Sequence, residues 1–286
     1  MAFETEFGNY SHVTDVLSDA LGPAIVESVV VTPLVYTETA PSGTNVKLFR
    51  KDGSLSAQDV AESASHTYAS GDEFTQSEVT ATLAKSVAFM KITIEAERFA
   101  PGAVAQAVRA AGNALARRLD DKILALFDGF SSQITATSTL TVDDLLDAVY
   151  TVHAANAGAG RQLNAVLDHK GLSEIRKEVN SSQAAIYSQP QRSDLLAGPF
   201  ASGAGYAGTL PGCDIYSTSG LPTDSGDDVA LVFNPDIAIA GMIDAAPIVW
   251  ESKETAGGMY TEFSAALFNT FVEWYDEGGC GLKSDT

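Results

Sequence analysis

The strongest hydrophobic pattern along the chain is helical and runs from Ala103 to Phe127. Apolar residues recur there at steps of three and four, namely Val104, Val108, Ala111, Leu115, Leu119, Ile123 and Leu126. This spacing places them on one face of a helix, and Pro101 stands just before it, where a missing N–H costs little. At about 1.5 Å per residue, such a helix would be roughly 37 Å long. The pattern predicts one long strut.

Before this helix the pattern is that of extended chain. Residues 1–32 carry scattered polar positions and then the apolar runs Ala24–Val26 and Val29–Val31, which indicates an irregular arm ending in a strand. Thr44–Arg50 alternates in part and is followed by Asp52-Gly53, a pair that favours tight turns.

A second extended run, Val79–Glu95, follows a polar stretch between Asp52 and Glu78 that has too few large apolar residues to build a core. The simplest geometry is a long two-stranded hairpin that projects from the body. An isolated ribbon is marginally stable in water at best. The hairpin therefore implies a neighbouring subunit on which it lies.

Beyond the long helix, helical and strand patterns alternate, which is typical of an α/β layer. Thr141 is the expected N-cap of a second helix, with Asp144 three residues later to complete the cap. The further elements expected are a strand at Leu163–Leu167, a helix at Gly171–Val179, an interface or mobile loop at Ser181–Gly212, strands at Asp214–Thr218 and Val229–Phe233, and a helical turn from Asn234.

The last part of the chain is strand-like again. Pro247–Glu251 leads to a Gly257-Gly258 turn and then to a long run, Met259–Tyr275, that is rich in large apolar residues. The two runs are expected to pair antiparallel and to pack against the long helix.

Composition limits the function more than the fold. The chain has 286 residues, 45% of them hydrophobic, which is enough for a sizeable core. Asp and Glu number 37 against 17 Lys and Arg, giving a net charge of -20. Sequence-specific nucleic-acid binding depends on Lys and Arg displacing counterions, so this charge argues against it. The acidity serves solubility or the lining of a container for DNA, and the sequence does not separate the two.

Targeting and redox signals are weak. Cys213 and Cys280 form no C-x-x-C pair, which argues against a zinc site and a secreted disulfide scaffold and favours a reducing assembly site. The opening residues Met1–Glu4 are acidic, unlike a signal peptide, and no apolar run approaches the roughly 18 residues that a membrane span needs.

Candidate chemistry is sparse. Gly203–Gly208 matches G-x-G-x-x-G, but Leu210-Pro211-Gly212 follows and excludes the helix that a dinucleotide site requires. His169 follows Asp168 at the end of a predicted strand, where α/β enzymes place active residues, yet it has no evident nucleophile partner. His12, His66 and His153 show no metal-ligand spacing.

Three acidic doublets, Asp120-Asp121, Asp143-Asp144 and Asp227-Asp228, lack the pattern of a calcium loop, and the two on predicted helices are expected on solvated faces. The sequence therefore predicts no catalytic, cofactor-binding or metal site and a protein that is not an enzyme.

The order of the parts resembles a known family. The similarity rests on the helix Ala103–Phe127, the segment Gly212–Pro222, and the close from Phe271–Tyr275 to Gly281–Lys283. In these features the chain resembles the major capsid proteins of tailed bacteriophages, whose fold is shared by encapsulins and the herpesvirus shell. The resemblance implies an α+β fold. Its parts would be an N-terminal arm (1–36), an extended hairpin loop with its base (37–95), a peripheral domain with the spine helix (96–140), an axial α/β domain (141–245) and return strands of the peripheral domain (246–286).

The resemblance also implies a function and partners. The chain would assemble into hexamers and pentamers of an icosahedral phage head, formed in the bacterial cytoplasm, which encloses DNA without reading its sequence and involves no membrane. Strand-like content begins by about Ala24, so the expectation is no leading scaffolding segment, and a separate scaffolding protein together with a portal. Some family members link a hairpin lysine to a neighbour's asparagine. Lys47 or Lys51 and Asn234 or Asn269 are available, but no motif matches.

Three alternatives remain at this point. An encapsulin would share the fold, but encapsulins resemble one another in opening with an amphipathic helix, whereas Phe3–Tyr10 is polar and unpatterned. An α/β enzyme acting through Asp168 and His169 would be active as a dispersed monomer. A phage tail or decoration protein would more often be all-β and lack the long helix.

Overall fold

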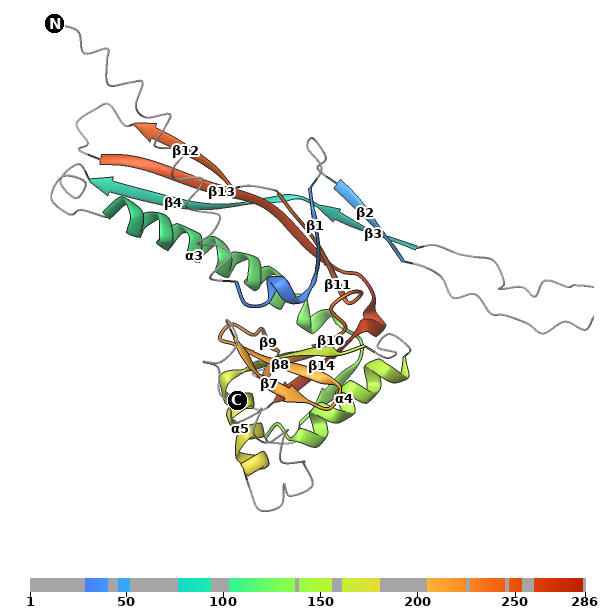
Figure 1. Ribbon diagram of the computed structural model, residues 1–286. Coiled ribbons are helices and arrows are strands. Elements are labelled where there is room, and N and C mark those ends of the chain that lie inside the picture. The colour runs from blue at the N-terminus through green and yellow to red at the C-terminus, as the bar shows by residue number, and fades with distance from the viewer. Residues whose placement is uncertain are drawn as a thin grey trace, which may run out of the picture.

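The computed structural model describes residues 29–40, 46–51, 77–93, 103–136, 139–155, 161–180, 205–224, 227–244, 247–253 and 260–284. Most of the expected N-terminal arm, residues 1–28, and the expected hairpin tip, residues 52–76, therefore lie outside the described residues. An elongated part built from a long sheet and one long helix stands above a lobe that holds a second sheet and two helices (Figure 1).

The elongated part is organised around one long strand. Within the described residues its sheet has five strands: β1 (Tyr36–Thr39), β4 (Ala84–Thr93), β11 (Ile239–Ile243), β12 (Ile248–Lys253) and β13 (Tyr260–Glu273). β13 pairs antiparallel with β4, β11 and β12, and β1 adds to β11 in parallel. The predicted antiparallel pairing of the two C-terminal runs is confirmed.

Helix α3 (Ala103–Leu124) lies along one face of this sheet (Figure 1). Five positions of its predicted stripe are almost fully buried: Val108, Ala111, Leu115, Leu119 and Ile123. The helix ends earlier than predicted, because the amide of Leu126 bonds to Ile123 O at 3.0 Å, which tightens the chain into a 3₁₀ turn, η2 (Phe127–Gly129). The turn places Phe127 in the core, against Phe233.

The lobe is the predicted α/β layer. Its sheet, within the described residues, contains β5 (Gln133–Thr135), β6 (Leu163–Asp168), β7 (Tyr206–Leu210), β8 (Cys213–Thr218), β9 (Thr223–Asp224), β10 (Asp227–Phe233) and β14 (Gly279–Ser284). β6 and β8 run parallel, and β10 lies between β6 and β14. Helices α4 (Val142–Ala154) and α5 (His169–Asn180) complete the layer.

The start of α4 is as the sequence predicted. The Thr141 hydroxyl accepts a hydrogen bond from the Asp144 amide at 3.2 Å, and the Asp144 carboxylate accepts one from the Thr141 amide at 2.9 Å. This reciprocal pair satisfies two backbone donors that would otherwise lack helical partners.

One expected loop differs in the structure. Ser181–Gly212 was expected to be a loop throughout, but Tyr206–Leu210 is strand β7, paired antiparallel with β8, and residues 181–204 lie outside the described residues. Gly205 and Gly212 flank β7 with φ values of 78° and 93°, which L side chains rarely adopt. The helical turn predicted from Asn234 is present: Ala238 N bonds to Asn234 O at 3.1 Å, and the chain then enters β11.

The chain crosses between the two sheets twice near its end. It leaves the lobe at β10, enters the long sheet at β11, and returns from β13 through a 3₁₀ turn, η4 (Asp276–Gly278), to β14. The crossings bond to each other, with Asn234 N to Gly278 O at 2.9 Å and Trp274 N to Ala238 O at 2.8 Å. These two crossings bind the elongated part to the lobe.

Both cysteines are buried in the lobe core and are free thiols. Burial, together with the charge of Asp214, raises the pKa of Cys213 to about 12, and burial raises that of Cys280 to about 11. Because the thiolate is the reactive form, we expect iodoacetamide at about pH 8 to leave the folded chain unlabelled and to modify both thiols after denaturation. Mass spectrometry counts the adducts, and rapid labelling of the folded chain would contradict the core placement.

Candidate assembly surface

The base of the predicted hairpin is a small sheet of its own. β2 (Val46–Lys51) pairs antiparallel with β3 (Ser77–Thr82), from Val46 opposite Thr82 to Lys51 opposite Ser77. Only Leu83 separates β3 from β4, so the ribbon continues the long sheet outward, as Figure 1 shows. An isolated ribbon of two strands is marginally stable, so the attachment of this base to the body matters.

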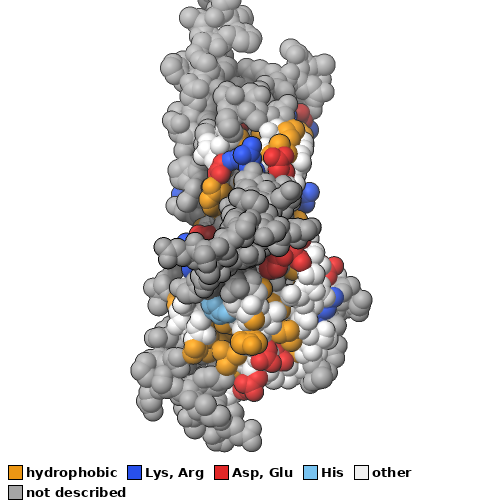
Figure 2. Space-filling view, turned by 90° about the vertical axis from the view of Figure 1, so that its right-hand side faces the viewer, with side chains coloured by type: hydrophobic (Ala, Val, Ile, Leu, Met, Phe, Trp, Pro, Cys, Tyr) orange, Lys and Arg blue, Asp and Glu red, His pale blue; other side chains and the backbone are white. Residues whose placement is uncertain are grey.

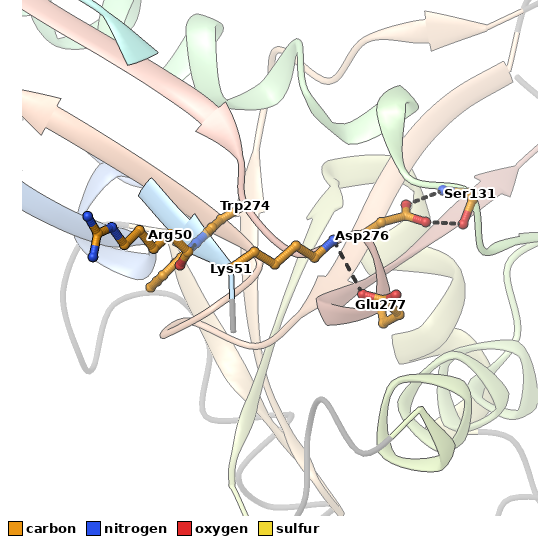
Figure 3. A network of polar contacts seen from close by, with 6 residues as sticks. All are labelled: Arg50, Lys51, Ser131, Trp274, Asp276 and Glu277. Atoms are coloured by element: carbon orange, nitrogen blue, oxygen red, sulfur yellow. Dashed lines mark hydrogen bonds and ion pairs between the residues drawn. The ribbon is translucent and has the colours of Figure 1, made fainter. Parts of the chain in front are cut away.

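One face of the ribbon is anchored to the body. Phe49 and Ala81 are buried against Ala240 of β11, with Val272 and Trp274 packed around them. The indole Nε1 of Trp274 donates to the Arg50 carbonyl at 2.9 Å (Figure 3). The ring of Trp274 also contacts the rings of Tyr36 and Phe49, with centroids 5.6 and 6.0 Å apart. Trp274 thus joins the hairpin base to the end of β13.

The opposite face of the ribbon is exposed and carries two large apolar side chains beside threonines and the Arg50–Glu78 ion pair. Side chains alternate along a strand, so Val46 and Leu48 point away from the face that carries Phe49. They are 46% and 48% exposed, and Phe89 on β4 is 82% exposed. Large apolar side chains left in solvent on adjoining strands are typical of a surface that another protein covers.

A polar network lies beside this anchor, where the chain returns to the lobe. Lys51 Nζ lies 3.7 Å from a Glu277 carboxylate oxygen and 5.2 Å from the centroid of the Tyr275 ring. Asp276 accepts hydrogen bonds from the Ser131 amide, at 2.7 Å, and from the Ser131 hydroxyl. Figure 3 shows the Lys51–Glu277 and Ser131–Asp276 interactions on either side of η4. This turn therefore holds the hairpin base on one side and the chain just after η2 on the other.

Glu273 in the same region carries an unfavourable charge. Burial raises the pKa of its carboxyl, the charges of Asp276 and Glu277 raise it further, and Lys51 opposes them. The folded state therefore binds this proton more tightly than the unfolded chain does. The free energy of unfolding therefore falls as pH rises from the pKa of Glu273 in the unfolded chain to its higher pKa in the folded chain. Above the folded-state pKa this loss is complete.

We expect Glu273→Gln to raise the melting temperature at about pH 7.5, and the gain over wild type to disappear as pH falls below the raised pKa. Calorimetry across this pH range measures both. Glu262→Gln on the same strand, where the carboxylate faces Lys91 on the sheet surface, is the matched control. A gain independent of pH would contradict the assignment.

The N-terminal segment is fixed where it meets α3. The carboxylate of Asp120 accepts hydrogen bonds from the amides of Val30, Val31 and Thr32 at 2.8, 3.2 and 3.0 Å, and from the Thr32 hydroxyl at 2.8 Å. Asp120 is 8% exposed, so the expectation that this doublet lies on a solvated helix face is wrong for Asp120. Its neighbour Asp121 is exposed as expected.

The residues available for a covalent link are engaged within the subunit. Lys47 forms an ion pair with Glu38, and Lys51 pairs with Glu277. Asn269 is fully buried, accepts from Lys122 and donates to Ser86 Oγ at 3.1 Å. Asn234 is also buried and accepts from the Asp236 amide at 3.0 Å. Neither amide is presented to a neighbouring chain.

The candidate enzyme residues do not form a catalytic arrangement. Asp168 accepts a hydrogen bond from the Lys170 amide at 2.8 Å, at the start of α5, and His169 lines a cavity of about 870 Å³. Among the described residues, no hydrogen bond joins His169 to a hydroxyl or a carboxylate. His153 lies in the last turn of α4, and His12 and His66 lie outside the described residues.

The remaining sequence motifs have structural surroundings. Asp144 belongs to the α4 cap, and the motif Gly203–Gly208 runs into strand β7, with no helix after it. Within the part of the chain that the structure describes, no three His, Cys, Asp or Glu side chains come together as metal ligands. No helix among these residues is both long and apolar enough to cross a membrane.

Sequence reasoning did not single out Trp274 or Asp120 as functional. Trp274 appeared as an aromatic residue in a long apolar strand and within the Phe271–Tyr275 segment of the resemblance, and neither gave it a role. Its contacts with β1 and β2 join residues more than two hundred positions apart. The only signal for Asp120 was a carboxylate next to the buried stripe of a helix, a position that solvent usually occupies.

No protein-family model and no curated protein sequence matches the chain. Solved structures do. The capsid of Ralstonia phage GP4 aligns with a TM-score of 0.69 at 10% identity, over 91% of this chain and 90% of that one. The structure of Mycobacterium phage Che8 aligns at 0.65 and 17% identity, over 89% and 90%. The virus-like particle from Pyrococcus furiosus aligns at 0.63 and 12% identity, over 94% and 99%.

These alignments extend along nearly the whole of each chain, and they include the long sheet, the helix beside it and the lobe together. At such low identity they establish the fold. The α+β architecture of this chain, with one long helix against a long sheet and a separate α/β lobe, is the fold of the phage major capsid proteins.

Proposed function

We propose that this chain is the major capsid protein of a tailed bacteriophage, which assembles into the icosahedral head that encloses phage DNA. The observation that carries the proposal is the hairpin base, which is anchored by Trp274 on one face and exposes Val46 and Leu48 on the other. A monomeric enzyme has no need of such a projection. The partner of the proposed capsid protein is a second copy of the same chain. The assembled protein is located in the virion.

The proposed parts keep the expected roles. The arm and the hairpin reach over adjacent subunits, the elongated part forms the peripheral domain, and the lobe forms the centre of hexamers and pentamers as the axial domain. Because a closed shell engages each subunit through several contacts at once, every contact can be weak and the assembly still stable. The chain crosses between the two domains from β10 to β11 and from β13 to β14, and these two crossings transmit load from one domain to the other.

The further partners belong to the proposal as well. A separate scaffolding protein sets the size of the shell, and a portal occupies one vertex. DNA packed inside contacts the shell without sequence recognition, which suits a net charge of -20. Catalysis has no part in this function.

A cellular compartment of the encapsulin type is the second candidate. It is favoured by the alignment with the virus-like particle from Pyrococcus furiosus, which covers 99% of that chain. The two functions differ in cargo: a phage head takes up DNA through a portal, whereas an encapsulin encloses protein.

Expression of the full chain, followed by negative-stain electron microscopy and light scattering, tests the proposal. Closed shells or rings of six and five subunits support it. A chain that stays monomeric, both alone and with the scaffolding protein that accompanies it in its genome, would exclude both shell functions. Co-purification of shells with a specific cellular protein would favour the encapsulin function.

A further inference from the structure

Helix α5 separates its charged side chains onto two sides. Glu174 accepts a hydrogen bond from the Leu140 amide at 2.9 Å, and Glu178 accepts one from the Val142 amide at 2.7 Å. Both carboxylates are thus used inside the subunit, where they satisfy amides at the start of α4. Neither Glu174 nor Glu178 lines the cavity that Arg176 and Lys177 line.

The cationic side of α5 lines the cavity of about 870 Å³, between the helix and the carboxyl end of β8. His169, Arg176 and Lys177 face it, with Leu172 and Val30 as its apolar part. No carboxylate is found among its described lining residues. Arg176 donates to the Ala207 carbonyl at only 3.5 Å, and its Nε is buried without a hydrogen-bond partner among the described residues. In a chain of net charge -20, this cavity is an unbalanced cationic site.

The outer face of α4 has the complementary character. Asp143, Asp147 and Tyr150 follow one another at steps of four and three, so they form a single stripe on the helix. All three are exposed, and Tyr150 is 72% exposed. Figure 1 shows α5 at the left of the lobe and α4 extending to its right. Figure 2 looks at that right-hand side and shows acidic and hydrophobic side chains adjoining on the lower part of the lobe.

We propose that the α4 stripe of one subunit docks into the α5 cavity of the next subunit within a capsomer. Tyr150 packs against Leu172 and Val30, and the carboxylates of the stripe approach Arg176 and Lys177. This inference rests on the proposed capsid function and names the contact that closes its rings. Two different surfaces of one chain make a heterologous contact, and such contacts generate rings when the rotation closes. Charge complementarity orients the approach, and the buried aromatic ring supplies the apolar contact.

A charge exchange in the full chain tests the contact. Lys177→Glu and Asp147→Lys each place like charges together, so each alone is expected to lower the yield of capsomers and shells by about tenfold. The chain that carries both changes restores an opposite pair at every contact, because each subunit presents both surfaces, and its yield is expected to return to near that of wild type. Light scattering and electron microscopy give the yields.

Matched controls separate this contact from effects on folding. Lys170→Glu makes the same change of charge on α5 at a position that does not line the cavity, and its assembly is expected to resemble that of wild type. Melting temperatures of all variants check the fold. Should Lys177→Glu fail to fold, Asp147→Lys and Tyr150→Ala carry the test, since both side chains are exposed in the subunit.

The outcomes distinguish a failure of the docking contact from a failure of the proposed capsid function. The docking contact would be overturned if both single variants assembled with the wild-type yield. It would also be overturned if the double variant gave no higher yield than the lower-yielding single variant. Either result would leave the capsid function intact. A wild-type chain that forms neither rings nor shells, even with scaffolding protein, would overturn the capsid function first. Rescue in the double variant, with Lys170→Glu unaffected, would establish the contact.

Discussion

Asp120→Ala is expected to lower the free energy of unfolding by about 3 to 5 kcal/mol, which for a chain of this size lowers the melting temperature by roughly 10 °C. The carboxylate accepts four hydrogen bonds from Val30, Val31 and Thr32, and Asp120 is almost fully buried. Removing it leaves buried amides without an acceptor, and this loss exceeds that of an ordinary surface hydrogen bond.

Two further substitutions test which contacts cause this loss of stability. Asp120→Asn keeps the shape and one acceptor oxygen but turns an amide donor toward a backbone N–H, so about half of the loss is expected. Asp121→Asn removes the neighbouring exposed carboxylate and should leave stability within about 0.5 kcal/mol of wild type. Thermal and urea unfolding measure all three variants. Equal stability of the Asp120 and Asp121 variants would show that the contacts with residues 30–32 do not hold the segment.

The hydrogen bonds of Asp120 are also expected to affect assembly of the shell. Residues 30–32 lie at the start of the first described segment, and α3 holds them through Asp120. We therefore expect Asp120→Ala to lower shell yield beyond the loss expected from its stability, because residues 30–32 would no longer be held against α3.

The parts of the fold that depend on local pattern could be predicted from the sequence. The stripe of α3, the cap at Thr141 and the strand β6 are each determined by residues within a few turns of one another. The end of α3 was wrong by three residues, because the burial of Phe127 against Phe233, a distant residue, decides where the helix stops. The strand β7 was missed because its glycines and small residues resemble a loop until β8 pairs with it.

The candidate site depends instead on contacts between distant residues. Asp120 meets residues ninety positions earlier, and Trp274 meets Arg50 across most of the chain. No periodicity encodes such pairs. The charges of α5 could not be assigned from the sequence for the same reason. Glu174 and Arg176 are two residues apart, yet Glu174 accepts a hydrogen bond at the start of α4 and Arg176 lines an open cavity. Only the placement of α4 beside α5 separates those roles.

The stiffness of the subunit follows from the two crossings between its sheets. β11 and β13 carry the chain into and out of the elongated part, and the amide of Trp274 bonds to Ala238 between them. The same residue, Trp274, holds the hairpin base through its side chain. The orientation of the hairpin is therefore tied to the orientation of the lobe through one short segment.

Trp274→Ala is accordingly expected to release the hairpin base while the lobe stays folded, and to abolish shell formation. The half-buried ring contacts Tyr36 and Phe49 and donates to the Arg50 carbonyl at 2.9 Å, so its removal should cost about 2 to 3 kcal/mol, concentrated in β2 and β3. Hydrogen–deuterium exchange should accelerate by about tenfold or more in these strands and stay unchanged in α3 and β6.

Trp274→Phe is the control that separates packing from hydrogen bonding at this position. It keeps one aromatic ring against Phe49 and loses the indole donor, worth about 1 kcal/mol, together with the area of the second ring, so shells should form with reduced yield. Shells at the wild-type level from Trp274→Ala, with unchanged exchange in β2 and β3, would show that the ribbon is held elsewhere. Faster exchange across the lobe as well would mean that Trp274 stabilises the whole subunit, because the crossings at β11 and β13 would then have opened along with the hairpin.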